Sequence, residues 1–185
     1  DMNERVKVYD EKMQKSIHSL EGELATIRAG RANPHVLDRI VVDYYGSPTP
    51  IQQVANVSVP EPRMIQIQPW EKSMIREIEK AIQVSDLGIN PTNDGTCIRL
   101  IFPELTEERR KELTKTVKKM GEDAKVAVRN LRRDVNDKVK KMEKDGELTE
   151  DELKKGLDHV QKMTDDGIKK IDEMISKKEK EVLEV

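Results

Sequence analysis

One stretch decides the fold of this chain, residues 106–146, which read TEERRKELTKTVKKMGEDAKVAVRNLRRDVNDKVKKMEKDG. Apolar residues recur in it at spacings of three and four, as in a helix that buries one face: Leu113, Val117, Met120, Ala124, Ala127, Leu131 and Val135. Thr106 before two glutamates indicates the start of the helix, and Gly146 indicates its end. At about 1.5 Å per residue the helix is roughly 60 Å long, so it needs partner helices along its whole length.

Two other segments supply such partners. Helical spacing runs from Asn3 to about Ala29, with apolar residues at Met13, Ile17, Leu20, Leu24 and Ile27. A third series comprises Leu153, Leu157, Val160, Thr164, Ile168, Ile171 and Ile175. Thr149 and Glu152 form the capping-box pattern that opens this third helix. The three apolar stripes predict a three-helix bundle, and close contact between helices is one interpretation of the helical Gly121, Gly156 and Gly167.

Residues 31–103 follow another pattern, with prolines from Pro34 to Pro103 and short alternating apolar runs. The runs predict strands at 40–45, 56–59, 64–68 and 96–102, with an amphipathic helix over 73–84. Asn33-Pro34 is typical of the start of a short helix. We expect the aromatic residues of this segment to form its core: Trp70, Phe102, Tyr44 and Tyr45.

The predicted fold class is therefore α+β. An elongated three-helix bundle, residues 1–29 and 105–185, carries a small inserted β-rich α/β domain, residues 31–103. The chain crosses between them twice, near 30–31 and 104–105, which makes Gly30, Arg31, Glu104 and Leu105 candidate hinge residues. Two linkers held rigid by a packed interface are an equally good interpretation.

Composition limits the partners and the compartment. The chain of 185 residues has 34 basic and 36 acidic side chains, a formal net charge of -2, so no global field attracts nucleic acid or an anionic membrane. A single cysteine, Cys97, excludes an intrachain disulfide and suits a reducing interior. No apolar run approaches the roughly 20 residues that span a bilayer, and no signal peptide is visible. We expect a cytoplasmic protein without a membrane partner.

The sequence contains no motif that indicates catalysis. The three histidines, His18, His35 and His159, lie on separate segments without a Glu-x-x-His pattern. Cys97 has no supporting nucleophile motif, and the glycines do not form a phosphate-binding loop. We therefore expect no enzyme activity, no metal and no cofactor; a hydrolase using scattered carboxylates is a remote alternative.

Arginine is the residue type that stands out. Arg129, Arg132 and Arg133 share the side of the long helix that faces away from its apolar series, Lys125 extends this side, and no acid intervenes. Arg110 adds charge near the helix start, and Arg28 and Arg31 flank Gly30. One hypothesis is a surface that contacts the phosphates of folded RNA, because the planar guanidinium group suits phosphate oxygens. The alternative is a solvated basic stretch with some pairing inside the bundle.

Five stretches together resemble bacterial ribosome recycling factor. They are IRAGRANP at 27–34, VDYYGSPTP at 42–50, SDLGINP at 85–91, LTEERRK at 105–111 and VAVRNLRRD at 126–134. Their order and spacing match that family over essentially the whole chain. One departure is the chain end, Leu183-Glu184-Val185, where the resemblance leads us to expect an aromatic residue.

The resemblance implies an L-shaped, two-domain translation factor that acts as a monomer on the ribosome left on messenger after termination. With elongation factor G and its GTP hydrolysis, such a factor separates the ribosomal subunits. The bundle is expected to bind large-subunit ribosomal RNA through Arg129, Arg132, Arg133, Arg28 and Arg31, with the inserted domain toward the small subunit. The competing hypothesis is a coiled-coil scaffold or holdase with a β-rich head, which binds other proteins.

Overall fold

The computed structural model describes residues 1–28 and 30–183. The chain divides into two compact units, one formed by Asp1–Ala29 with Thr106–Val185 and the other by Gly30–Leu105. The first helix ends at Ala25, with Thr26 as its C-cap, rather than near Ala29 as predicted. Ala29 and the chain end at 184–185 lie outside the described residues.

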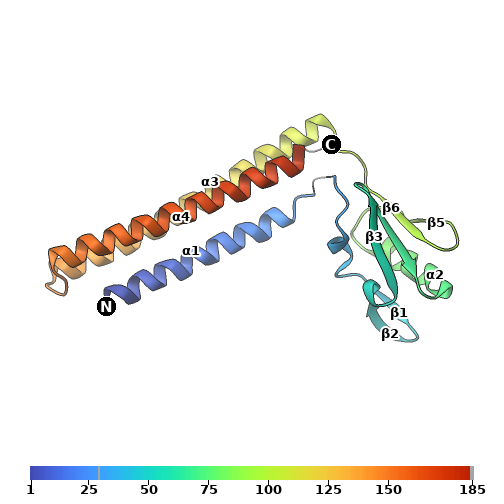
Figure 1. Ribbon diagram of the computed structural model, residues 1–185, viewed down its shortest axis with the longest axis horizontal. Helices are drawn as coiled ribbons and strands as arrows, with labels where there is room; N and C mark the ends of the chain where they lie inside the picture. The colour runs from blue at the N-terminus through green and yellow to red at the C-terminus, as the bar shows by residue number, and fades with distance from the viewer. Residues whose placement is uncertain (29, 184–185) are drawn as a thin grey trace. The chain divides into compact units, whose positions relative to one another are not determined.

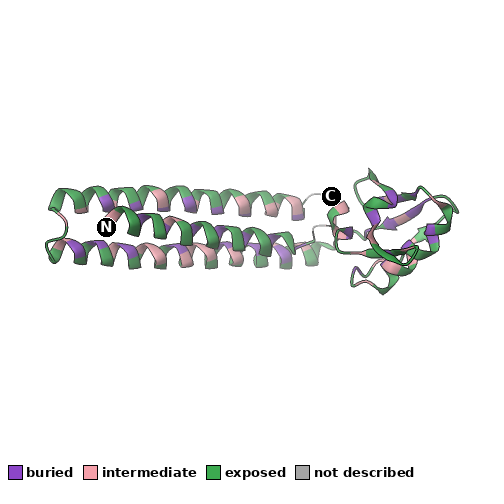
Figure 2. Ribbon diagram, turned by 90° about the horizontal axis from the view of Figure 1, so that it is seen from below, coloured by how far each residue is buried: buried purple, intermediate pink, exposed green. Residues whose placement is uncertain are grey.

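The first unit consists of three long helices, α1 (Met2–Ala25), α3 (Glu107–Lys144) and α4 (Glu150–Leu183). They lie side by side, and α3 runs antiparallel to the other two (Figure 1). Buried residues recur along the sides that the helices turn toward one another (Figure 2). The predicted three-helix bundle with an inserted β-sheet domain is confirmed, as are the predicted helix starts and ends to within a few residues after residue 104.

The apolar series of the first helix is correct, because all five predicted residues are buried. The series of α3 is shifted: Met120, Ala124, Ala127 and Leu131 are only half-buried, whereas Gly121, Val128 and Val139 are buried. The reason is that α3 contacts both α1 and α4, so its buried stripe is wide and centred between the two contacts. A single row of spacings describes only one edge of such a stripe.

The connection between α3 and α4 is fixed at both of its ends. Gly146 has φ 79°, and its N–H donates to the Glu143 carbonyl at 3.0 Å, while the Glu147 N–H donates to the Met142 carbonyl at 2.8 Å. This pair of bonds is the Schellman arrangement that ends a helix at glycine. Two residues beyond Glu147, the Thr149 N–H donates to Glu152 Oε1 and the Glu152 N–H to Thr149 Oγ1, each at 3.1 Å, which confirms the capping box.

Glycines allow the helices to approach closely. A Cβ added at Gly121 would lie 2.6 Å from Ile175 Cγ1 on α4. At Gly156 and Gly167 it would meet the sulfur atoms of Met2 and Met13 at 2.5 and 2.6 Å. The interpretation of these glycines as close-contact positions is therefore correct.

The bundle core contains one buried polar pair. The hydroxyl groups of Tyr9 on α1 and Thr164 on α4 share a hydrogen bond, and Thr164 Oγ1 also donates to the Val160 carbonyl at 2.7 Å. Burial raises the pKa of the Tyr9 phenol. Each hydroxyl group in the pair therefore has a partner, and the pair joins two helices that are far apart in the sequence.

The second unit is built on a four-stranded antiparallel sheet. Strands β3 (Ala55–Glu61), β4 (Met64–Pro69), β6 (Ile98–Ile101) and β5 (Thr92–Asn93) lie in that order, and β1 (Val41–Tyr44) pairs with β2 (Ser47–Pro50) in a separate hairpin. Helix α2 (Ile75–Val84) and three 3-10 turns (Pro34–Leu37, Ile51–Gln53 and Lys72–Met74) complete it. The core is aliphatic; its fully buried members include Ile65, Ile67, Ile78, Ile98 and Leu100.

The last strand was predicted to begin at Thr96, but it begins at Ile98. The Asp94 carboxylate accepts the N–H groups of Thr96 and Cys97 at 3.0 and 2.8 Å, which holds these residues in a turn. The same bonds lower the pKa of Asp94. Strands β2 and β5 were not predicted, since β2 has a proline at every second position and β5 has only two residues.

The expectation of an aromatic core is wrong for two residues. Phe102 is buried, but Trp70 is 68% and Tyr45 is 79% exposed. Tyr45 occupies a two-residue hairpin turn with Gly46, and both have positive φ angles, 50° and 84°. The phenol groups of Tyr44 and Tyr45 donate to the two oxygens of Glu71 at 2.8 and 2.7 Å. These bonds lower the pKa of Glu71, and the bond from Tyr45 has the larger effect. Tyr44 packs against the edge of the core, whereas Tyr45 lies at the surface.

Replacing Gly121 with alanine tests the close helix contact. The new methyl group collides with buried Ile175, and overpacking of this kind costs about 1–3 kcal/mol, more than the helix propensity of about 1 kcal/mol gained by replacing glycine. Gly22 on α1 has no atom within 4 Å of an added Cβ and is the matched control. Urea unfolding followed by circular dichroism should show a less stable Gly121→Ala and a slightly more stable Gly22→Ala. Equal stabilisation of both variants would contradict the contact.

Candidate nucleic-acid interface

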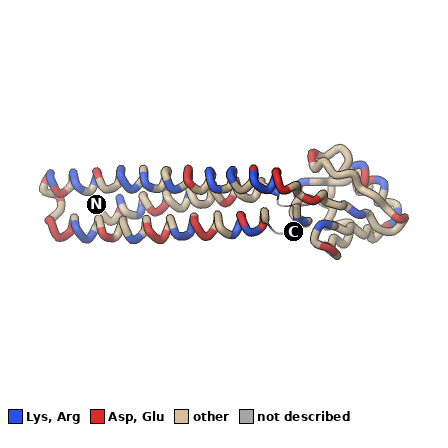
Figure 3. Tube along the Cα trace, turned by 90° about the horizontal axis from the view of Figure 1, so that it is seen from above, with Lys and Arg blue, Asp and Glu red and all other residues tan. Residues whose placement is uncertain are grey.

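Helix α3 carries most of the positive charge of the bundle. It has 14 basic and 8 acidic residues, an excess of six positive charges, whereas α4 has 8 basic and 10 acidic residues. Figure 3 shows the basic residues recurring along the helices of the bundle, interrupted by acidic ones. A chain with a net charge of -2 therefore has a local positive surface on one of its helices.

Arg129 and Arg133 form the exposed part of this surface. Val128 is fully buried at the centre of the stripe, and Arg129 and Arg133 follow it at roughly 100° and 140° around the helix, at about 100° per residue. Neither side chain makes an ion pair or hydrogen bond with any residue that the structure describes. Both guanidinium groups therefore present their donors to solvent or to a ligand, as predicted from the sequence.

Arg132 and Lys125 lie at the edge of α3 that contacts α4. Arg132 is half-buried, and its Nη1 donates to Gln161 Oε1 at 3.4 Å. Lys125 is 17% exposed, and its ammonium group pairs with Asp172 on α4 and with Glu122. The bond to Asp172 is the main reason why the pKa of Lys125 is raised. These two side chains contribute to the contact between the helices as well as to the local charge.

Arg110 is separated from the other arginines of α3. It precedes Arg129 by 19 positions, about 28 Å along the axis and roughly 100° around it. Arg110 is half-buried, and its Nε is buried without a hydrogen-bond partner among the described residues. The structure therefore does not bring Arg110 to the same surface as Arg129 and Arg133.

Arg28 and Arg31 are both exposed, and each has an interaction partner. Arg28 follows the end of α1 in the first unit, and Arg31 lies near the start of the second unit. Arg28 therefore belongs to the helical unit and Arg31 to the inserted unit.

The candidate hinge residues lie where the second unit begins and ends. Gly30 has φ 78°, and a Cβ there would lie 3.2 Å from Leu105 Cγ. Two segments near these ends are fixed to the turn between β3 and β4: the Ala32 N–H donates to the Pro62 carbonyl at 2.7 Å and the Phe102 N–H to the Arg63 carbonyl at 2.8 Å.

The same turn also contacts Glu104, one of the candidate hinge residues. Arg63 Nη1 lies 3.7 Å from Glu104 Oε2. Sequence reasoning missed Arg63, and only the Glu61-Pro62-Arg63 turn pattern between two predicted strands could have drawn attention to it.

Other kinds of site find little support. The described residues contain no group of three or more histidine, cysteine or carboxylate side chains placed to hold a metal ion. Cys97 is buried as a free thiol. Across residues 1–28 and 30–183, no helix combines the length and apolar character needed to cross a bilayer.

Comparisons with known proteins agree over the whole chain. The family described as Ribosome recycling factor matches residues 20–183. The chain is 65% identical over 184 residues to Ribosome-recycling factor of Caldicellulosiruptor bescii, covering 100% of both, and 62% identical over 180 residues to that of Clostridium perfringens, covering 97% of both.

Two solved structures are also similar. A solution structure of the ribosome recycling factor has a TM-score of 0.78 at 39% identity and covers 100% of this chain and 98% of that one. The second, at 44% identity and a TM-score of 0.63 with both chains fully covered, is described as models for the T. thermophilus ribosome recycling factor and the E. coli elongation factor G bound to the E. coli post-termination complex. The chain therefore belongs to the ribosome recycling factor family.

Proposed function

We propose that this chain binds the post-termination ribosome and, with elongation factor G and GTP, separates its subunits, using the arginine surface of α3 to bind large-subunit ribosomal RNA. Members of this family are translation factors without enzymatic activity, and one similar structure is of a family member with elongation factor G on the post-termination complex. The observation that carries the RNA part is the pair Arg129 and Arg133, exposed and without partners among the described residues.

The chemistry of the surface suits phosphate. A guanidinium group offers planar pairs of donors to phosphate oxygens, and each phosphate that is neutralised releases counterions. The surface has no aromatic side chain on which a base could stack, so contacts to the backbone of folded RNA are favoured over contacts to unpaired bases. Arg28 and Arg31 are further candidates for the same RNA, and Lys125, Arg132 and Arg110 add charge near it.

Separating the ribosomal subunits requires a rigid structural element, which we assign to the three-helix bundle, and a partner that supplies energy. Helix α3 has 38 residues, about 57 Å at about 1.5 Å per residue, and is supported by two other helices along its length. Hydrolysis of GTP belongs to elongation factor G, and the inserted unit is the part that we assign to the side of the small subunit.

The two chain crossings support a hinge at Gly30, Arg31, Glu104 and Leu105. The glycine conformation at Gly30 and the non-helical backbone of the described residues at both crossings allow changes of φ and ψ there. The proposal includes action as a monomer in the cytoplasm, where ribosomes translate. A protein-binding scaffold is less well supported, because exposed α3 side chains are mainly charged rather than apolar.

Removing the two exposed arginines tests the RNA surface. Arg129→Ala combined with Arg133→Ala should weaken binding to isolated large subunits about tenfold and lower the slope of log affinity against log salt by about 2, one for each phosphate contact. Filter binding across a salt titration measures both. The matched control replaces Lys162 and Lys169, two exposed lysines of α4, with alanine, which also removes two positive charges. The same loss in the control would indicate general charge rather than a surface on α3.

Replacing Gly30 with alanine tests the hinge. Alanine at a positive φ is strained by roughly 1 kcal/mol, and here its methyl group also meets Leu105. Gly88→Ala is the control, because Gly88 has φ 74° in the same unit but no atom near an added Cβ. Subunit splitting with elongation factor G and GTP should fall several-fold in Gly30→Ala and stay near normal in Gly88→Ala, with large-subunit affinity unchanged in both. Normal splitting by Gly30→Ala would mean that the crossing need not move.

A further inference from the structure

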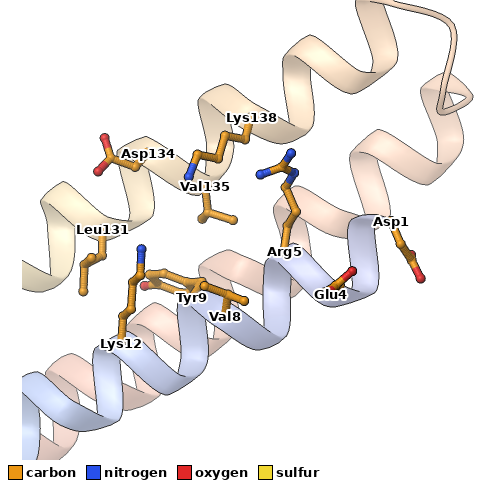
Figure 4. A pocket seen from close by; sticks show the side chains of 10 residues that line it. All are labelled: Asp1, Glu4, Arg5, Val8, Tyr9, Lys12, Leu131, Asp134, Val135 and Lys138. Atoms are coloured by element: carbon orange, nitrogen blue, oxygen red, sulfur yellow. The ribbon is translucent and has the colours of Figure 1, made fainter.

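A groove of about 350 Å³ runs between α1 and α3, near the start of α1 (Figure 4). It lies along the edge of α3 that contacts α1, away from the edge at which Lys125 and Arg132 contact α4. Apolar side chains form part of it: Val8 is 41% exposed, Leu131 is half-buried and Val135 is buried. Val8 is one of the few large apolar side chains that the bundle exposes among its described residues.

Three cationic side chains surround these apolar residues. Arg5 and Lys12 extend from α1 toward α3, and Lys138 extends from α3 (Figure 4). None of the three side chains makes an ion pair or hydrogen bond within residues 1–28 and 30–183. Three positive charges are therefore gathered beside apolar surface without partners.

Two carboxylates lie at positions suited to pair with these cations but do not pair with them. Asp1 lies four positions before Arg5 and Asp134 four before Lys138, the spacing of helical ion pairs. The Asp1 carboxylate instead accepts the Asn3 N–H at 3.0 Å as the cap of α1, and the Asp134 carboxylate points away from the groove (Figure 4).

Elsewhere in the bundle such pairs do form. They include Lys111 with Glu107, Lys119 with Asp123 and Lys155 with Asp151. Many other basic side chains of the bundle, Arg129 and Arg133 among them, are also unpaired among the residues that the structure describes; what distinguishes Arg5, Lys12 and Lys138 is that they lie together beside exposed apolar surface.

We propose that this groove binds a protein segment in which carboxylate side chains flank an apolar one. The apolar side chain would contact Val8, Leu131 and Val135, and the carboxylates would pair with Arg5, Lys12 and Lys138. This arrangement matches charge to charge and apolar surface to apolar surface, as grooves that bind amphipathic helices do. The inference goes beyond the proposed function, because its ligand is a protein and its surface is a different edge of α3.

The lining of the groove favours a peptide over RNA. An RNA strand carries a charge at every nucleotide, so the lining carboxylate of Glu4 would repel it, whereas a peptide can place its few acids on the cations alone. Phosphates would also leave the exposed Val8 without an apolar partner. The ring of Tyr9 is only 2% exposed, so no base could stack on it.

The test is a titration of the full chain with a short synthetic amphipathic helix built from glutamate and leucine. Its matched control has glutamine in place of every glutamate. Methyl NMR signals of Val8, Leu131 and Val135 should shift in a saturable way with the acidic peptide, and the shift should weaken in added salt. Lys138→Gln and Arg5→Gln should each lower the affinity about three- to five-fold, as for a partly exposed ion pair. Lys140→Gln, an exposed α3 lysine outside the groove, should leave it unchanged.

Three results would overturn the proposal. The acidic peptide could leave the three methyl signals unmoved, or the glutamine peptide could shift them equally, which would indicate apolar contact without charge recognition. A short RNA hairpin could shift them where the acidic peptide does not, which would make the groove an RNA surface. Because Arg129 and Arg133 lie outside the groove, the double variant Arg129→Ala, Arg133→Ala should bind the peptide normally even where it loses the large subunit.

Discussion

The apolar face of α3 has to be covered along all 38 residues of that helix, and the surfaces of the bundle follow from how α1 and α4 cover it. A helix of this length gains its stability from tertiary packing rather than from propensity, so both partners must accompany it. Their positions divide the polar circumference of α3 into three parts. One edge contacts α4, one edge contacts α1, and the remainder faces outward.

Each part uses its basic residues differently. At the α4 edge, Lys125 pairs with Asp172 and Arg132 donates to Gln161, so cations help to hold two helices together. On the outward part, Arg129 and Arg133 have no partner among the described residues, and we propose them as phosphate contacts. At the α1 edge, Lys138 faces a groove beside exposed apolar surface. Residues of one type thus acquire three roles through their angle around a single helix.

The sequence predicted the architecture well because helical spacing, caps and turn glycines are local signals. The capping box at Thr149 and Glu152, the stop at Gly146 and the outward direction of Arg129 and Arg133 could all be read from neighbouring residues. Features that depend on distant residues could not. Asp172, which pairs with Lys125, lies on another helix, and nothing near Lys125 indicates it.

The aromatic residues show the same limit in the second unit. Tyr44 and Tyr45 were expected inside, since aromatic residues are commonly buried. Glu71, 27 and 26 positions away, accepts a hydrogen bond from each phenol group, and Tyr45 remains at the surface of a tight turn. The core is filled mainly by isoleucine and leucine from the sheet and α2; Phe102 is the aromatic member of this buried cluster, and Tyr44 packs against it.

The near-neutral net charge of the chain is combined with an uneven distribution of charge among its helices. A bundle with a large net positive charge would bind any nucleic acid through long-range attraction. Here α3 has an excess of six positive charges and α4 an excess of two negative ones, and acidic residues elsewhere bring the net charge of the chain to -2, so the chain as a whole exerts little long-range attraction on nucleic acid. Close to the outward part of α3 the local charge is positive, because Arg129 and Arg133 are exposed there and neither pairs with an acid among the described residues. Under the function proposed above, attraction would be strong only for a partner whose shape brings phosphates into contact with that surface, which would favour a folded RNA over RNA in general.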